Sequence, residues 1–329
     1  IVHVSVRAKD NDPVAAGITR GISAARQATG RAKPVYICWM AEGDLERTFT
    51  VDGETVPTYP HPEIPAHIIS RALAYGAWRR QPFGKVPGYT EVDLSTAKAL
   101  CAKALSERGS GWLTTEETHA LLDAMKLPLV QGTVATSAEE AVKLASKIGF
   151  PVAVKLASRH IVHKTEIGAV RLNLADEQAV RHAFEAIRSR LAQDHKMEAM
   201  EGVLVQSMLT GGVEVMVGMT RDPLFGPLLA FGLGGIHVEI LGDVQFRITP
   251  LTDRDAIEMV REIKSYRLLQ GYRGQPASDI KAIGDILLRI SHLVEEIPEI
   301  SELDLNPIFA LPEGQGCKIV DARIRVELR

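Results

Sequence analysis

A lysine lies within an otherwise apolar run, PVAVKLA at residues 151–157, and this feature constrains the fold more than any other. The run has the length and composition of a buried strand. Burial of an ammonium group is costly unless the group meets an anion. Lys155 therefore either reaches an anion or lies at a strand edge where its amine contacts water, and the strand alone leaves both interpretations open.

The segment that follows this strand, SRHIVHKTEIGA, gathers polar groups of the kind that bind phosphates. Such loops supply cations and backbone N–H groups. A single histidine is more often structural, but a cluster beside a strand lysine favours a phosphate-binding loop. A metal site built from the two histidines is an alternative, although no third ligand lies close in sequence. The residues of interest are Ser158, His160, His163, Lys164, Thr165 and Gly168.

Two segments near the end of the chain, ELDLNPIFAL and KIVDARIRVEL, predict the strands of a hairpin. Alternate residues of a strand share a face, so Asn306 lies with Glu302 and Asp304 while Leu305 points into the core. Asp321 on the partner strand can then face Asn306. Mg²⁺ prefers such oxygen ligands, and two converging strands favour a metal site over a solvated polar face.

The sequence FGLGGIHVE contributes glycines at 232, 234 and 235 directly after a predicted strand. A dinucleotide-binding fingerprint needs a helix after the third glycine, and no long helical pattern follows here. A tight turn between strands and a loop that faces phosphates explain these glycines equally well. The chain contains no Walker A sequence.

The order of predicted elements divides the chain in two. Residues 1–78 show the strand, helix, strand order of a parallel sheet unit, followed by a helix. Residues 79–91, which are rich in Pro, Gly and basic residues, predict a linker. Residues 92–329 combine helices with a succession of strands that suggests antiparallel pairing, and capping patterns at Thr114 and Ser137 open two of the helices. We expect an α/β chain whose second part is α+β.

The composition argues against several classes of protein. The net charge of −3 gives no basic excess for a nucleic-acid partner. No apolar run reaches the roughly 18–20 residues that span a bilayer, and no signal peptide is visible. Cys38, Cys101 and Cys317 form no CxxC pair, which fits reduced thiols of the cytosol. We expect a cytoplasmic protein without a nucleic-acid or membrane partner.

Taken together, these motifs resemble the ATP-grasp half of the NDP-forming acyl-CoA synthetases, a family that includes succinyl-CoA synthetase and ADP-forming acetate–CoA ligase. The resemblance covers roughly residues 92–327 and implies a two-lobed ATP-grasp domain over residues 92–329. Residues 1–78 resemble the last part of the flavodoxin-like CoA-ligase domain. The resemblance rests on KLASRHIVHKTEIG (155–168), LVQSM (204–208), GVEVMVGMTRDPLFGPLLAFGLGG (212–235), VEILGDVQFRITPL (238–251), LDLNPI and IVDAR.

The resemblance implies where ATP or ADP binds. Lys155 would hold the phosphates, residues 234–235 would let a loop approach them, and residues 206–208 would form the hinge that contacts adenine. Glu214 and Asp222 would lie along the same cleft. The full set implied in nucleotide binding is Lys155, Ser158, Thr165, Gly168, Gln206, Ser207, Met208, Glu214, Gly234 and Gly235.

The resemblance also implies an acid–thiol ligase that forms acyl-CoA, ADP and phosphate from an acid, CoA and ATP. His163 matches the histidine that shuttles the phosphoryl group, with Lys164 beside it, and Asn306 and Asp321 would hold Mg²⁺. An imidazole is a good nucleophile near neutral pH, and cations neutralise the transferred phosphoryl group. The carboxylic acid and CoA would bind mainly to upstream CoA-binding domains, with which the chain would assemble.

The sequence departs from the family pattern after Ser158, where Arg159 and His160 replace the usual Pro-Asp. Ala169 replaces a second glycine, which changes the flexibility of the loop because glycine adopts conformations that alanine does not. Neither change removes His163.

Two other functions stay open. One is a regulatory segment of a fused protein-lysine acetyltransferase that senses a nucleotide or acyl-CoA. The other is an ATP-grasp ligase that joins a carboxylate to an amine and needs no shuttling histidine. The presence of His163 with the two metal ligands favours the synthetase. Because the chain begins with Ile1 in a strand-like run, we expect a fragment of a longer polypeptide or a processed chain, which binds Mg-nucleotide but forms no acyl-CoA alone.

Overall fold

A computed structural model describes residues 1–7, 10–30, 33–41, 47–161, 164, 167–235, 242–272 and 274–328. The chain forms two compact units, Ile1–Phe83 and Gly84–Arg329. Within the described residues, no helix combines the length and the hydropathy needed to cross a membrane. The two units are described separately below.

The first unit contains the predicted parallel strands. β1 (Val2–Val6) pairs in parallel with β2 (Ile37–Ala41), which pairs in parallel with β5 (Thr58–Tyr59). Helix α1 (Asn11–Thr29) connects β1 to β2, and its Ile22 packs in one core with Trp39. The strand, helix, strand prediction is therefore confirmed. The unit ends with α2 (Glu63–Arg80), and a short antiparallel ladder of β3 (Phe49–Val51) and β4 (Glu54–Val56) was not predicted.

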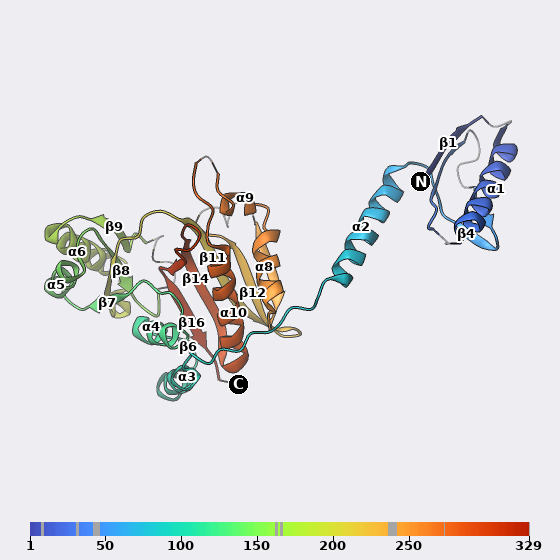
Figure 1. Ribbon diagram of the computed structural model, residues 1–329. Coiled ribbons are helices and arrows are strands. Elements are labelled where there is room, and N and C mark those ends of the chain that lie inside the picture. The colour runs from blue at the N-terminus through green and yellow to red at the C-terminus, as the bar shows by residue number, and fades with distance from the viewer. Residues whose placement is uncertain are drawn as a thin grey trace. The chain divides into compact units, whose positions relative to one another are not determined.

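One part of the second unit is built on a four-stranded sheet in the order β7-β10-β8-β9. Helices α5 (Ala138–Ile148) and α6 (Glu177–Gln193) pack on this sheet and share one apolar core with it (Figure 1). All six residues of β8 are buried, because it is an interior strand. The strands are β7 (Gly132–Ala135), β8 (Val152–Ala157), β9 (Val170–Leu174) and β10 (Gly202–Ser207).

The rest of the second unit is built on a seven-stranded antiparallel sheet in the order β13-β12-β11-β14-β16-β6, with β15 beside β14. Helices α8 (Asp253–Glu262) and α10 (Ile280–Glu296) pack on it, as do α3 (Leu94–Arg108) and α4 (Thr115–Ala124), and α9 (Tyr266–Leu269) follows α8. The expected α+β arrangement is confirmed. The strands are β6 (Gly111–Trp112), β11 (Val213–Asp222), β12 (Gly226–Leu233), β13 (Val244–Ile248), β14 (Ile300–Ala310), β15 (Cys317–Ile319) and β16 (Ala322–Val326), and a short 3-10 helix, η2 (Met197–Ala199), precedes β10.

The segment predicted as a linker, residues 79–91, divides between the units. Residues 79–80 complete α2, whereas residues from 84 onward lie against α8 and α10. The backbone of Lys85 exchanges two hydrogen bonds of 2.9 Å with Asp253. The Arg289 guanidinium lies 4.6 Å from the ring centroid of Tyr89. The second half of the predicted linker is therefore a packed segment of the larger unit.

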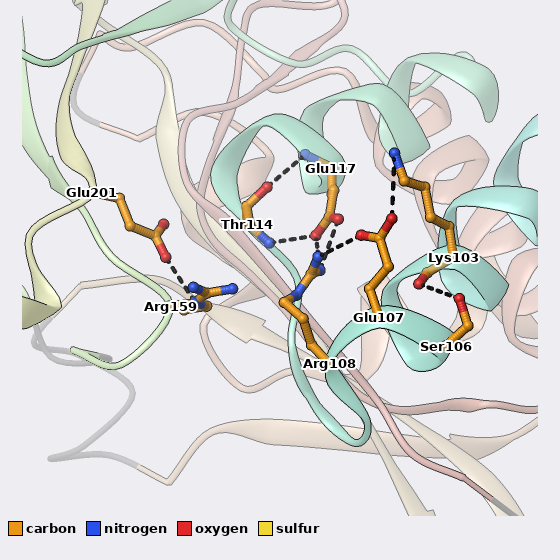
Figure 2. A network of polar contacts seen from close by, with 8 residues as sticks. All are labelled: Lys103, Ser106, Glu107, Arg108, Thr114, Glu117, Arg159 and Glu201. Atoms are coloured by element: carbon orange, nitrogen blue, oxygen red, sulfur yellow. Dashed lines mark hydrogen bonds and ion pairs between the residues drawn. The ribbon is translucent and has the colours of Figure 1, made fainter.

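The capping pattern at Thr114 forms a complete capping box at the start of α4. Thr114 Oγ1 accepts a hydrogen bond from the Glu117 N–H at 3.2 Å, and Glu117 accepts one from the Thr114 N–H at 2.9 Å. Glu117 also pairs with Arg108 at 2.6 Å, which ties α4 to the end of α3 (Figure 2).

We expect Thr114→Ala to lower the free energy of unfolding by about 1 kcal/mol, because one backbone donor of the first helical turn loses its acceptor. Ser106→Ala is the matched control, since Ser106 is an exposed hydroxyl on neighbouring α3 and its loss should change stability by no more than about 0.5 kcal/mol. Urea unfolding followed by circular dichroism measures both. Equal stability of the two variants would contradict a structural cap.

Candidate functional site

Lys155 reaches across from the four-stranded sheet to the seven-stranded sheet. Its side chain is only 5% exposed, and its Nζ donates a hydrogen bond of 3.0 Å to the carbonyl of Val320, between β15 and β16. Burial lowers the pKa of the Lys155 ammonium, while the nearby carboxylate of Asp321 opposes this effect. The alternative of a strand-edge lysine that contacts water is therefore wrong.

Asn306 and Asp321 meet across the strands, as the sequence predicts. The Asn306 N–H donates a hydrogen bond of 3.2 Å to the Asp321 carbonyl, and the next pair in register is Leu305 with Ala322. Leu303 and Leu305 are buried on the opposite face of β14, as expected. The two residues are therefore neighbours in the backbone pairing of the strands, and a common site for their side-chain oxygens stays a prediction.

Two lysines keep Asp321 negatively charged. The Lys164 Nζ lies 3.6 Å from Asp321 Oδ1, and the two side chains are only 7% and 18% exposed. Burial raises the pKa of the Asp321 carboxyl, but Lys164 and Lys155 outweigh burial and hold this pKa below its usual range. The site therefore presents a carboxylate at neutral pH between two cations.

The donor set of Asn306 and Asp321 fits a hard cation that is only partly held by protein. Mg²⁺ binds one or two carboxylates and completes its shell with water and phosphate oxygens. Across the ranges that the structure describes, no group of three or more His, Cys, Asp or Glu side chains gathers around a metal position. The oxygen pair therefore suits Mg²⁺ that also binds a phosphate, and it does not suit a structural zinc site.

The predicted hinge forms the end of β10. Gln206 is 1% exposed and its Nε2 donates to the Val130 carbonyl at 3.1 Å, so this side chain anchors the strand. The Met208 N–H donates to the Pro151 carbonyl at 3.2 Å. A backbone hydrogen bond from Met208 to a ligand would therefore use its carbonyl as the acceptor. Ser207 between them is exposed.

The glycine turn after β12 closes against β11. The Gly234 N–H donates to the Glu214 carbonyl at 2.8 Å. A Cβ at Gly234 would lie 3.2 Å from the Val215 carbonyl oxygen, a tight contact that would require the neighbouring backbone to shift by a few tenths of an ångström. Gly235 has a φ of 68° and lies beside the Glu214 carboxylate. The turn and Glu214 are therefore in contact with each other, and their place at a nucleotide site stays a prediction.

The expectation that Glu214 and Asp222 lie along one cleft stays a prediction, and the structure shows how far apart the two residues are. Glu214 and Asp222 lie at opposite ends of β11, and eight residues of strand correspond to roughly 26 Å. Asp222 Oδ1 instead accepts hydrogen bonds from the N–H groups of Leu224 at 2.8 Å and Phe225 at 2.9 Å. Its role is to order the turn into β12.

The loop after β8 begins with an ordered turn. Ser158 Oγ accepts hydrogen bonds from the His160 N–H at 3.2 Å and the Ile161 N–H at 3.1 Å. Arg159, one of the departures from the family pattern, pairs with Glu201 at 2.9 Å (Figure 2). Gly168 has a φ of 68°. His163 and Thr165 lie outside the described residues, and Lys164 between them is buried.

The structure adds two residues that sequence reasoning missed. His119 on α4 lies close to the site. Burial lowers the pKa of its imidazole, the charge of Asp321 opposes this effect, and the charge of Lys164 adds to it. No local pattern signals this helix residue, because about forty positions separate it from Lys155. Arg323 lies near Asp321, since its charge helps to lower the pKa of that carboxyl, and it was predictable because it follows Asp321 by two positions.

A family model described as an ATP-grasp domain matches residues 103–326. The chain is 43% identical over 232 residues to the beta subunit of acetate–CoA ligase [ADP-forming] I of Pyrococcus furiosus, covering 70% of this chain and 98% of the subunit. It is 38% identical over 283 residues to 4-hydroxybutyrate–CoA ligase [ADP-forming] of Nitrosopumilus maritimus. This match covers 86% of the chain and only 40% of that ligase.

Solved structures agree. An acetyl-coenzyme A synthetase of Ca. Korarchaeum cryptofilum, in complex with coenzyme A and Ca-AMPCP, is 42% identical with a TM-score of 0.66. The match covers 70% of this chain and 99% of that chain. The same protein was solved with Mg-AMPPCP and a phosphohistidine segment that points towards the nucleotide-binding site, at 40% identity and a TM-score of 0.60, covering the same shares.

Proposed function

The chain belongs to the ATP-grasp family, as the ATP-grasp portion of an ADP-forming acyl-CoA ligase, and on this basis we propose that it transfers a phosphoryl group from ATP to His163. The phosphohistidine then serves the formation of acyl-CoA from a small carboxylic acid and CoA. The observation that carries the proposal is the convergence of Lys155, Lys164, Asn306 and Asp321 at the junction of the two sheets.

Each residue has a proposed role that follows from its position. Lys155 and Lys164 bind phosphate oxygens of ATP, because both are buried cations next to one carboxylate. Asn306 and Asp321 would hold Mg²⁺, which neutralises phosphate charge when it is bound. The hinge at residues 206–208 and the Gly234–Gly235 turn with Glu214 would border the adenine and phosphate ends of the nucleotide. Ser158, Thr165 and Gly168 would shape the loop that carries the histidine.

The chemical step needs few other groups. An imidazole nitrogen of His163 forms a bond to the γ-phosphorus while the bond from this phosphorus to the bridging oxygen breaks, and ADP leaves. The protein supplies orientation and positive charge, which is most of what phosphoryl transfer requires. A ligase that joins a carboxylate directly to an amine needs no such histidine.

The partners proposed for this chain are the CoA-binding domains of the same type of ligase. Support comes from the relatives. One is a separate beta subunit, 98% of which the chain covers, and another is a ligase of which the chain covers only 40%. A carboxylic acid and CoA would bind mainly to those domains. The alternative of a regulatory segment in an acetyltransferase has no support among these relatives.

Incubation of the chain with Mg²⁺ and ATP labelled at the γ-phosphate tests the proposal. We expect acid-labile, base-stable label on the protein, removal of that label by excess ADP, and none when EDTA withholds the metal. ATP labelled at the α-phosphate is the control and should leave no label. Measurable ATP binding without any labelling would contradict the phosphohistidine and favour a sensing role, while acyl-CoA formation by the chain alone would contradict the need for partner domains.

A further inference from the structure

Strand β13 lies at one end of the seven-stranded sheet, and its outer edge is open. Among the described residues, it pairs with β12 alone. Natural proteins usually block such an edge with proline, with a bulge or with a very short strand. β13 has five residues, contains no proline or glycine, and keeps an uninterrupted register with β12. The edge therefore offers its unpaired backbone groups to a further strand.

The register with β12 shows which backbone groups point outward. The Thr249 N–H donates to the Pro227 carbonyl at 3.2 Å, so position 249 directs its backbone groups at β12. Hydrogen-bonded positions alternate along an antiparallel pair, so positions 245 and 247 also face β12. The N–H and C=O groups of Val244, Phe246 and Ile248 therefore point to the open edge.

The side chains of β13 place apolar groups on the outer face. Gln245 and Arg247 lie on the side of helix α8, where both form hydrogen bonds with Glu262. Phe246 and Ile248 alternate with them and are 53% and 49% exposed. Apolar side chains beside unpaired backbone groups are typical of a site where another strand adds to a sheet.

We propose that β13 pairs with β13 of a second copy of this chain, antiparallel and centred on Phe246. The strand reads VQFRI, so apolar and polar residues alternate symmetrically about its centre. The pairing places Phe246 opposite Phe246 of the second copy, Val244 opposite Ile248, and Gln245 opposite Arg247. Every outward-pointing backbone position then meets another, and apolar side chains meet apolar side chains.

Charge and symmetry select this pairing. A register centred on Arg247 would bring two guanidinium groups directly opposite each other, which is destabilising. A register centred on Gln245 would place Ile248 opposite Gly242, outside the strand. A twofold axis through Phe246 uses each open edge once, so the assembly closes at two copies. The proposal concerns assembly, and it does not depend on phosphoryl transfer to His163.

Sedimentation velocity over a series of protein concentrations tests the dimer. We expect the mass to rise from that of one chain to that of two, because a five-residue strand forms a small interface that dissociates on dilution. Phe246→Lys should raise the dissociation constant at least tenfold, since two ammonium groups would meet at the twofold axis. The matched control is Leu172→Lys on edge strand β9, where Leu172 is 52% exposed, and it should change the constant less than twofold.

Disulfide formation tests the register. Hydrogen-bonded partners in an antiparallel pair have Cα atoms about 5.5 Å apart, which is within disulfide range. Phe246→Cys should therefore cross-link two copies on mild oxidation, and the native cysteines do not interfere because they are buried. Ile248→Cys is the control on the same face of the strand. Its counterpart lies roughly 13 Å further along the partner strand, so it should cross-link at least tenfold more slowly.

Three results would overturn the proposal. The first is the mass of one chain at every concentration. The second is a dimer that Phe246→Lys leaves intact, because the two copies would then associate through another surface. The third is equal cross-linking of Phe246→Cys and Ile248→Cys, which would indicate random collision instead of a fixed register.

Discussion

His163→Ala should abolish labelling of the chain by γ-labelled ATP, with a decrease of at least about 1,000-fold, because the variant lacks the nitrogen that accepts the phosphoryl group. Nucleotide binding should stay within about threefold of wild type, since the cations and oxygen ligands described above are unchanged. Acid-labile label and calorimetric affinity for ADP measure the two quantities on the same protein.

His160→Ala provides the matched control in the same loop. The His160 imidazole is exposed, and only its backbone N–H takes part in the turn at Ser158. Labelling of this variant should therefore equal that of wild type within twofold. Retained label on His163→Ala, or loss of label in both variants, would show that the acceptor lies elsewhere.

Asp321→Asn should have the second largest effect, because it removes a proposed metal ligand and, among the described residues, the one carboxylate close to both buried lysines. We expect labelling to decrease at least about 100-fold, and the free energy of unfolding to decrease by about 3–5 kcal/mol, as for other buried pairs that lose one partner. Glu302→Gln on β14 is the control, since its ion pair with Arg325 is partly exposed and contributes less than about 1 kcal/mol.

The double variant Asp321→Asn/Lys164→Met separates stability from chemistry. It removes one uncompensated cation, so it should recover part of the lost stability but none of the labelling. The contribution of Asp321 to stability also depends on pH in a defined direction. Because its folded pKa is depressed, the contribution is complete above the unfolded pKa near 3.9 and is lost as the pH falls through the folded pKa. A stability difference between wild type and Asp321→Asn that does not shrink in acid would contradict this assignment.

The sequence predicts the central part of the site because that part depends on strand periodicity. The alternation around Asn306 and the apolar strand around Lys155 are local patterns, and both residues lie where these patterns indicate. The spacing of Glu214 and Asp222 along one strand, in contrast, sets a distance that a family motif does not express. The periodicity of a strand thus predicts which of its residues share a face. Membership in a family motif does not by itself predict where a residue lies in the fold.

Other features depend on tertiary contacts and leave no local signal. Strand β6 has two residues, and β3 and β4 have three each. These lengths are too short for a periodic pattern, so the strands can be recognised only from their pairing with a neighbouring strand. The proximity of His119 to Asp321, and the pairing of Arg159 with Glu201, join segments more than forty positions apart. The fold class and the order of most helices follow from the sequence, but such contacts do not.

The hydrogen bond from Lys155 to the Val320 carbonyl has a consequence for the strength of nucleotide binding. A free lysine side chain loses up to about 2 kcal/mol of rotamer entropy when a ligand orders it. Lys155 is held in place by the protein itself, so most of this cost is met on folding, and preorganisation should favour affinity. An incoming phosphate oxygen then competes with one neutral carbonyl, a weaker acceptor than an anion, and exchange of the two acceptors requires no rearrangement of the strands.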